Sequence, residues 1–127
     1  MGDQKSVLCV EDDSDACALA AAVLKEFEVI TAASKADAVE KVKLRNYSLI
    51  LVDYFLPDGT GEEFTKHVRI FDKRTPILFV TGYVGEAGEA DAFAGHVVLR
   101  KPYTLARLAA ALAEALGART AEQREPV

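Results

Sequence analysis

Four short apolar runs in this chain each end directly in a polar or charged residue, and this feature limits the folds open to it. The runs are Val7–Val10, Leu49–Val52, Pro76–Val80 and His96–Leu99. Each has the length and composition of a strand that is buried on both faces, as strands of parallel sheets are. In open parallel sheets, ligands bind just beyond the carboxyl ends of the strands. We therefore expect the residues that follow the four runs to meet at one edge of a sheet.

Strand and helix patterns alternate along the chain. The expected strands are residues 6–10, 28–32, 49–52, 76–80 and 96–99. The expected helices are residues 14–26, 34–45, 61–71 and 104–117. Between residues 83 and 95 the helix pattern is weak, because glycine costs a helix about 1 kcal/mol relative to alanine and recurs there. The pattern predicts an α/β fold with a doubly wound, five-stranded, mainly parallel sheet and a short or irregular fourth helix.

Local sequence predicts where the helices begin, end and pack. Ser14, Ser34 and Thr104 are the expected N-caps, because their hydroxyls can accept a hydrogen bond from the first turn. Gly117 is the expected end of the last helix. The apolar faces expected to pack on the sheet are formed in the first helix by Leu19, Ala22 and Val23, and in the last by Leu105, Leu108, Leu112 and Leu116.

Composition predicts one small globular domain. The chain has 127 residues, half of them hydrophobic, and we expect a domain over residues 5–117 followed by a flexible tail over 118–127. The net charge of −5 argues against nucleic-acid binding through the phosphate backbone.

The apolar runs are too short for a membrane span or a signal peptide, so we expect a cytoplasmic protein with no membrane contact. Cys9 and Cys17 lack metal-binding or redox-pair spacing and are expected to be reduced thiols in or near the core.

Three carboxylates stand at the expected strand ends. Glu11 and Asp12 follow the first run, and Asp53 follows the second. Carboxylates held close together raise one another's pKa, and a hard divalent cation relieves that repulsion. Carboxylate oxygens suit Mg²⁺ or Mn²⁺. We therefore predict Glu11, Asp12 and Asp53 as metal ligands, whereas Asp13 and Asp15 are expected to be solvated loop acids.

Thr81 and Lys101 add a hydroxyl and an ammonium to the three carboxylates. A carboxylate can act as a nucleophile and form an acyl phosphate. The entering phosphoryl group carries negative charge on its equatorial oxygens, which a cation, the Lys101 ammonium and the Thr81 hydroxyl can each neutralise. The residues predict phosphoryl transfer to Asp53, with Thr81 and Lys101 as its catalytic partners.

The chain resembles receiver domains of two-component response regulators over roughly residues 5–117, in the motifs Val10-Glu11-Asp12-Asp13, Val52-Asp53-Tyr54-Phe55-Leu56-Pro57, Thr81-Gly82 and Lys101-Pro102. The resemblance implies a flavodoxin-like (βα)5 fold and a phosphorylation-dependent signalling module that is not an enzyme acting on other substrates. It also implies a sensor histidine kinase or a histidine phosphotransferase as phosphoryl donor, and a downstream protein partner whose binding changes on phosphorylation.

The same resemblance gives the phosphoryl-binding residues their roles. Asp53 matches the phosphoacceptor of the family, and Thr81 matches its switch hydroxyl. Lys101 matches the phosphate-binding lysine, whose peptide bond to Pro102 is typically cis in the family.

The metal ligands carry over in the same way. Asp12 matches the carboxylate that binds the metal directly, and Glu11 matches the acid that acts mainly through metal-bound water. Phe55 matches the residue whose backbone carbonyl binds the metal. Pro57 and Gly61 match the loop that follows the phosphoacceptor.

One position departs from the family pattern. Receiver domains usually carry Tyr or Phe three residues before the lysine, where this chain has Val98. Tyr83 is a candidate for the missing aromatic switch, together with Thr81. The stretch from Phe79 to Tyr83 is similar to a Phe-x-Thr-Gly-Tyr-like motif found after the fourth strand of a subgroup of stand-alone receivers.

Other functions fit parts of the sequence. Asp58-Gly59-Thr60 is similar to part of the haloacid dehalogenase phosphatase motif, but the nucleophile position of that motif is Leu56 here. A structural pseudo-receiver that is not phosphorylated is a second alternative, and a receiver segment of a hybrid histidine kinase is a third. We expect a stand-alone receiver without an output domain, because few residues follow the last helix. His67 and His96 lie far from other metal ligands in the sequence and are expected to be structural.

Overall fold

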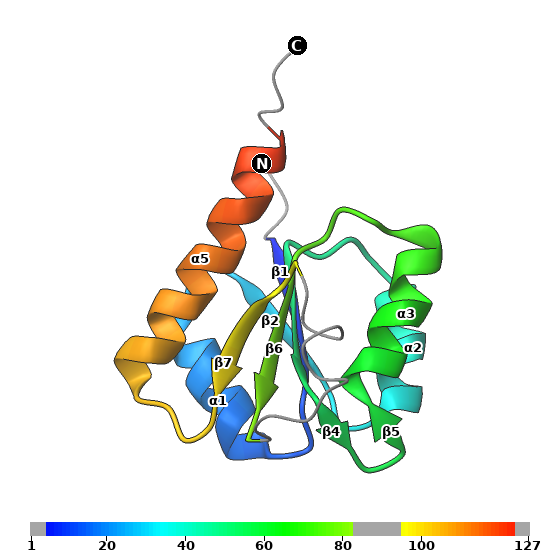
Figure 1. The fold of residues 1–127 in the computed structure, drawn as a ribbon, viewed down its shortest axis with the longest axis horizontal. Coiled ribbons are helices and arrows are strands. Elements are labelled where there is room, and N and C mark those ends of the chain that lie inside the picture. The colour runs from blue at the N-terminus through cyan, green and yellow to red at the C-terminus, as the bar shows by residue number, and fades with distance from the viewer. Residues whose placement is uncertain (1–4, 83–94, 124–127) are drawn as a thin grey trace.

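Five parallel strands form the central sheet of the computed structural model, which describes residues 5–82 and 95–123. The strands lie in the order β2-β1-β3-β6-β7, and Figure 1 shows their sheet between the helices. Their bounds are β1 Ser6–Val10, β2 Glu28–Ala32, β3 Leu49–Asp53, β6 Ile77–Thr81 and β7 Val97–Arg100. This is the flavodoxin-like order that the sequence predicted, and every strand lies within one residue of its expected bounds.

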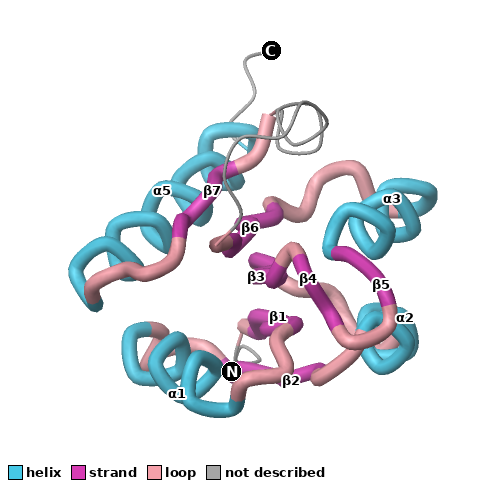
Figure 2. The backbone as a smooth tube through the Cα atoms, turned by 60° about the horizontal axis from the view of Figure 1, so that its bottom comes forward, coloured by secondary structure: helices cyan, strands magenta, loops and turns pink. Residues whose placement is uncertain are grey.

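Helices cover both faces of the sheet. Those in the described residues are α1 Ser14–Val23, α2 Lys35–Val42, α3 Gly61–Phe71 and α5 Leu105–Gln123. Figure 2 shows α1 and α5 on one face and α2 and α3 on the other. The predicted fourth helix falls on residues 83–94 and lies outside the described part of the chain.

Apolar side chains pack on both faces of the sheet. Every residue of β1, β3 and β6 is buried, as predicted. The fourth run was predicted wrongly to be buried on both faces, because β7 lies at the edge of the sheet and only Leu99 in it is fully buried. Successive side chains of a strand point to opposite faces, so Cys9 and Leu51 join the core beneath α1 and α5, whereas Leu8 and Ile50 join the core beneath α2 and α3. The sheet is therefore a rigid frame for the residues at its strand ends.

The N-terminal end of α1 differs from its prediction. Asp13, not Ser14, is the N-cap, because its side chain accepts a hydrogen bond from the Asp15 N–H at 2.9 Å while Ser14 is the first helical residue. The helix also ends at Val23 rather than near residue 26. At that end the Leu24 N–H still bonds to the Ala20 carbonyl, at 2.9 Å, before the chain turns into β2.

The buried face of α1 was predicted only in part, because Val23 packs against the core as expected but Leu19 and Ala22 do not. Cys17 and Ala20 face the core, whereas Leu19 is 45% exposed and Ala22 is exposed too. The helix consists largely of alanine, which fits either face, so its sequence carries little of the periodicity that normally marks the buried side.

Helix α2 begins as predicted and ends early. The Ser34 hydroxyl accepts a hydrogen bond from the Asp37 N–H at 3.1 Å, which confirms Ser34 as the N-cap. The helix stops at Val42 instead of residue 45 because the next N–H groups turn inward to carbonyls three residues back, as in the bond from Lys43 to Glu40 at 3.3 Å.

Helix α5 runs past its predicted end. Its N-cap is Thr104 as expected, since the hydroxyl accepts a hydrogen bond from the Arg107 N–H at 3.1 Å. Leu108 and Leu112 are buried, but Leu105 is 56% exposed and does not belong to the packed stripe. The predicted stop at Gly117 is wrong, because the helix continues to Gln123. Glycine weakens a helix by about 1 kcal/mol without ending it unless the backbone turns left-handed there.

A small hairpin that the sequence did not predict follows β3. Strands β4 Phe55–Leu56 and β5 Gly59–Thr60 pair in antiparallel fashion around the turn residues 57–58. Helix α3 begins directly after the hairpin with a complete capping box: the Thr60 hydroxyl accepts from the Glu63 N–H, and the Glu63 carboxylate accepts from the Thr60 N–H. The pattern Thr60-x-x-Glu63 is the sequence signal that could have predicted this capping box.

Candidate functional site

The three predicted metal ligands meet at the carboxyl edge of the sheet. Strands β1 and β3 are neighbours in which Val10 lies opposite Val52, so the chain leaves both strands side by side. Glu11, Asp12 and Asp53 each place one carboxylate oxygen within 4.8 Å of the others. The structure therefore brings together side chains separated by about forty residues, as the predicted sheet required.

Burial makes this carboxylate group unusual. Glu11 and Asp53 are each only 7% exposed, whereas Asp12 is exposed at the rim. Burial, together with the negative charge of Asp53, raises the pKa of Glu11 to about 8, even though the positive charge of Lys101 opposes the shift. Buried carboxylates that repel one another at this spacing form a donor set that suits an oxygen-coordinated divalent cation.

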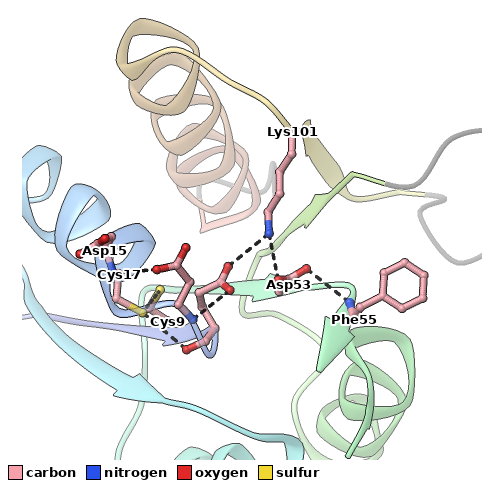
Figure 3. Close-up of polar contacts among 8 residues, drawn as sticks. Cys9, Asp15, Cys17, Asp53, Phe55 and Lys101 are labelled. Carbon is pink, nitrogen blue, oxygen red and sulfur yellow. Dashed lines mark hydrogen bonds and ion pairs between the residues drawn. The ribbon is translucent and has the colours of Figure 1, made fainter. Parts of the chain in front are cut away.

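Lys101 reaches this carboxylate group from the far side of β6. Its Nζ lies 3.0 Å from Asp53 Oδ2 and 3.8 Å from Glu11 Oε1 (Figure 3). Its backbone is fixed by a 2.8 Å hydrogen bond from its N–H to the Thr81 carbonyl, and the bond to Pro102 is cis, as the resemblance implied. Burial alone would lower the pKa of Lys101, but the hydrogen bond to Asp53 and the two carboxylate charges outweigh it and raise the pKa.

Thr81 ends β6, the strand between Asp53 and Lys101. Asp53 pairs with Val80 in the sheet, so Thr81 stands one residue beyond the level of Asp53 at the same edge. Its side chain is 0% exposed. The backbone around it is tightly held, since the Tyr54 N–H donates to the Val80 carbonyl at 2.8 Å. The position of Thr81 fits its predicted place beside Asp53.

Phe55 adjoins the predicted phosphoacceptor through its backbone. Its N–H donates to Asp53 Oδ1 at 3.3 Å, while its ring is 53% exposed and points away from the carboxylates (Figure 3). The ring packs edge-on against Tyr54, with the centroids 4.9 Å apart. The role of the Phe55 carbonyl as a metal ligand stays a prediction.

The two predictions about the aromatic switch have different outcomes. Tyr83 lies outside the described residues. Val98, at the position where the family usually has an aromatic residue, is half-buried on β7 and packs on the core beneath α2 and α3.

The turn after Asp53 is held by contacts that sequence reasoning missed. The Asp58 carboxylate accepts hydrogen bonds from the Lys35 and Ala36 N–H groups at 2.7 and 2.9 Å, at the start of α2. These two bonds lower the pKa of Asp58. The Lys35 ammonium also pairs with Glu63 at 3.3 Å, so the hairpin, α2 and α3 are tied together. Nothing in the local sequence signals a contact between residues this far apart.

Gly61, the first residue of α3, lies close to the backbone of Asp53. Its N–H donates to the Tyr54 carbonyl at 2.7 Å. A Cβ atom at this position would lie 2.7 Å from the Asp53 carbonyl oxygen and 3.1 Å from Val52 Cγ2, so only glycine fits. The match of Gly61 to the loop after the acceptor thus has a steric reason.

The remaining candidates take ordinary structural places. His67 packs edge-on against Phe71, and His96 packs edge-on against Phe79, with burial lowering the pKa of His96. Leu56, the nucleophile position of the phosphatase alternative, is a buried leucine of the core.

The comparison with known families agrees with this site. The family model of the response regulator receiver domain matches residues 7–113 of the chain. The chain therefore belongs to the response regulator receiver domain family: it is a two-component receiver domain with an acidic pocket. Such domains are usually signalling modules rather than enzymes.

Individual relatives support the same assignment. The chain is 32% identical to the transcriptional regulatory protein ZraR of Klebsiella oxytoca, over 99% of the chain and 29% of that protein. It is 36% identical to the cell cycle response regulator CtrA of Brucella ovis, over 62% of the chain and 35% of that protein. The chain thus spans about a third of the length of the curated relatives it matches.

Solved structures share the fold. A CheY-like response regulator receiver domain from Methanospirillum hungatei matches with a TM-score of 0.82 and 25% identity, over 94% of this chain and 99% of that one. The chemotaxis response regulator CheY4 of Vibrio cholerae matches with a TM-score of 0.79 and 29% identity, over 89% of this chain and 99% of that one. In the described part of the chain, no helix combines the length and the apolar character that a membrane crossing requires.

Proposed function

We propose that Asp53 accepts a phosphoryl group from the phosphohistidine of a sensor histidine kinase or histidine phosphotransferase, and that phosphorylation changes the affinity of this domain for a downstream protein. One observation carries the proposal: a buried carboxylate, Asp53, lies 3.0 Å from the Lys101 ammonium and within a group of three carboxylates that suits a divalent cation. Few structural roles require this combination, whereas phosphoryl transfer to a carboxylate requires all of it.

The chain's own residues account for the transfer step. A carboxylate oxygen of Asp53 attacks phosphorus, the bond from phosphorus to the donor imidazole breaks, and its electron pair returns to the imidazole nitrogen, which takes up a proton. Lys101 already lies beside Asp53 Oδ2, so it can transfer its hydrogen bond to an entering phosphoryl oxygen. The Thr81 hydroxyl, at the end of the adjacent strand, is the candidate partner for another oxygen.

A divalent cation completes the charge balance. Glu11, Asp12 and Asp53 would hold Mg²⁺ or Mn²⁺, with the Phe55 carbonyl as a further ligand. When bound, the cation neutralises carboxylate and phosphoryl charge that Lys101 alone cannot.

Phosphorylation of Asp53 must then change the surface that a downstream partner binds. We assign Thr81 and Tyr83 as switch residues because Val98 cannot act as the usual aromatic switch. The net charge of −5 favours a protein as the downstream partner over nucleic acid. The cytoplasmic location, the stand-alone architecture and the boundaries at 5–117 and 118–127 stay predictions, since the matched relatives are longer proteins.

The proposal is tested by intact mass. Wild type and Asp53→Asn are incubated with Mg²⁺ and acetyl phosphate, and separately with a phosphorylated kinase. Wild type is expected to gain the mass of one phosphoryl group, and Asp53→Asn to gain none. Asp13→Asn is the matched control, because Asp13 is an exposed helix cap outside the carboxylate group, and it should still be phosphorylated. Equal labelling of wild type and Asp53→Asn would refute the proposal.

A further inference from the structure

Two thiols lie in contact directly beneath the acidic loop. Cys9 Sγ, on β1, is 3.3 Å from Cys17 Sγ, on α1, and both cysteines are free and buried. The sequence predicts reduced core thiols but not a pair, because the two residues come together only when α1 folds back on β1. Figure 3 shows the two sulfurs beside the loop that leads to the carboxylates.

The cysteine pair brackets two of the predicted metal ligands in the sequence. Glu11 and Asp12 both lie in the segment that runs from Cys9 to Cys17. The Cys17 thiol also donates a weak hydrogen bond to the Glu11 carbonyl oxygen, at 3.8 Å. Any change in the bonding of Cys17 therefore acts on the backbone that presents Glu11 and Asp12.

A small molecule can reach Cys17. A cavity of about 320 Å³ lies between α1 and β2, and Cys17 lines it together with Glu11, Asp12 and Ser14. Asp12 and Ser14 are exposed residues, so the cavity opens to solvent at the acidic rim. Cys9 does not line this cavity and is 1% exposed, so it can react only with a partner that is already inside, namely Cys17.

We propose that Cys9 and Cys17 form a redox modification site, in which a hydroperoxide converts the two thiols into an intramolecular disulfide that weakens cation binding at the acidic loop. The Cys17 thiolate attacks a peroxide oxygen, the O–O bond breaks, and Cys17 becomes a sulfenic acid as hydroxide leaves and takes up a proton. The Cys9 thiol then attacks the Cys17 sulfur, the S–OH bond breaks, and water leaves. The two thiols lose two electrons in total, and hydrogen peroxide is reduced to two molecules of water.

The effect on the acidic loop follows from which element can move. A disulfide requires a sulfur separation of about 2.05 Å, so the sulfurs at 3.3 Å must approach further. Cys9 is held on β1 between β2 and β3, opposite Thr31 and Leu51, so α1 must move toward it. That movement pulls on Asp13, which caps α1, and removes the thiol hydrogen bond to Glu11. Carboxylates that now lie within 4.8 Å of one another are then displaced.

The first test asks whether the disulfide forms. Wild type is treated with hydrogen peroxide in the native state, and its intact mass and free thiols are measured before and after reduction with dithiothreitol. The expected product is a monomer that is lighter by two hydrogen atoms, has no alkylatable thiol, and recovers both thiols on reduction. Cys17→Ala, which keeps the core thiol Cys9, should not lose two hydrogens. Peroxide treatment that leaves both thiols free, or yields only disulfide-linked dimers, would overturn the proposal.

The second test asks whether the disulfide acts on the site. Mg²⁺ binding is measured by calorimetry on the reduced and the oxidised forms of the same wild-type protein, so that no variant has to fold. The oxidised form is expected to bind Mg²⁺ on the order of tenfold more weakly, the effect typical of losing support around metal ligands. By reciprocity, saturating Mg²⁺ should shift a thiol–disulfide redox equilibrium toward the reduced form by the same factor. Equal Mg²⁺ affinities in the two forms would contradict the coupling.

The consequence for phosphorylation rests on the proposed function, and the experiments separate the two. If the reduced protein does not accept a phosphoryl group from acetyl phosphate, the proposed function fails, whereas the mass and calorimetry results still decide the redox site. If the reduced protein is phosphorylated and the oxidised form is labelled equally fast at limiting Mg²⁺, the redox control of the site is refuted.

Discussion

The Lys101 ammonium lies 3.0 Å from Asp53 Oδ2, although the two residues follow strands that are separated by β6. The contact depends on the length of the lysine side chain and on the hydrogen bond from the Lys101 N–H to the Thr81 carbonyl, which sets the lysine near the level of Asp53. The ammonium is also 3.8 Å from Glu11 Oε1, so one cation serves two carboxylates. The contact between Lys101 and Asp53 is the basis of the first prediction.

Replacing Lys101 with alanine should weaken the response to a phosphoryl mimic more than it weakens metal binding. The Lys101→Ala variant loses the group that neutralises a phosphoryl oxygen but keeps all three carboxylates. We expect Mg²⁺ affinity to be retained, and beryllofluoride affinity to fall by on the order of tenfold or more, since each 1.4 kcal/mol of lost interaction is a factor of ten. Calorimetry with each ligand measures both quantities.

The matched control for Lys101 is Lys35→Ala. Lys35 pairs with Glu63 at 3.3 Å, outside the carboxylate group, so its loss should leave beryllofluoride binding unchanged. If Lys101→Ala binds beryllofluoride as well as wild type does, Lys101 has no role at the phosphoryl position.

Stability without Mg²⁺ should fall as pH rises, because of Glu11. Burial and the neighbouring Asp53 raise the pKa of Glu11 from 4.5 to about 8, so the folded protein holds this proton more tightly than the unfolded chain does. The stabilising contribution is complete below the unfolded value of about 4.5 and is lost as pH rises through about 8. Protons and Mg²⁺ compete for Glu11, so stabilisation by Mg²⁺ should grow over the same range.

Thermal denaturation is measured at the two ends of this pH range, once with chelator and once with Mg²⁺. It gives the change of stability with pH for the metal-free and for the Mg²⁺-bound protein. Glu11→Gln is the control, because it keeps the shape of the side chain and cannot titrate. Its metal-free stability should depend less on pH than that of wild type. A Glu11→Gln variant with the full wild-type slope would show that a group other than Glu11 is responsible for the pH dependence.

Alanine should have opposite effects at two glycines. At Gly61 the added Cβ would lie 2.7 Å from the Asp53 carbonyl oxygen, and we expect a loss of about 1–3 kcal/mol in the free energy of unfolding. At Gly117 no heavy atom lies within 4 Å of the added Cβ, and the residue is inside α5, so alanine should stabilise by up to about 1 kcal/mol. Urea denaturation measures both changes.

The Gly117 result also tests where α5 ends. If the helix stopped at Gly117 in a left-handed turn, as the sequence suggested, alanine would destabilise the protein instead. Destabilisation by Gly117→Ala would therefore show that α5 ends at Gly117, as the sequence predicted.

Two leucines of α5 should differ sharply in their contribution to stability. Leu112 is 1% exposed and lies in the core beneath α1 and α5, so Leu112→Ala should cost about 2–5 kcal/mol. Leu105 is 56% exposed, and Leu105→Ala should change stability by less than about 0.5 kcal/mol. Equal losses in denaturant unfolding would mean that all the leucines of the predicted stripe pack on the sheet.

The strands and their order were predictable because burial on both faces leaves a strong local signal. Runs such as Leu49–Val52 can hardly be exposed, and the handedness of crossovers then fixes the order of the strands. The site followed from the same reasoning, since Glu11 and Lys101 directly follow strands and Asp53 is the last residue of one. Their convergence needed only the rule that parallel strands end at one edge.

Helix faces and ends were less predictable because they depend on contacts between distant segments. The face of α1 was misplaced in part because alanine fits either side, and α5 passes Gly117 because a single glycine only weakens a helix. The hydrogen bonds from α2 to Asp58 join residues more than twenty positions apart. The contact between Cys9 and Cys17 likewise appears only once α1 has packed on β1.

The proposal that Asp53 is the phosphoacceptor is tested most simply by locating the phosphoryl group chemically. The protein is phosphorylated with acetyl phosphate and Mg²⁺, the acyl phosphate is reduced with borohydride, and the digested peptides are sequenced by mass spectrometry. Reduction converts a phosphorylated aspartate into homoserine, so the account predicts homoserine at position 53 and unchanged aspartate at position 12. Homoserine at position 12, or a phosphorylated protein with unmodified Asp53, would contradict the claim that Asp53 is the phosphoacceptor.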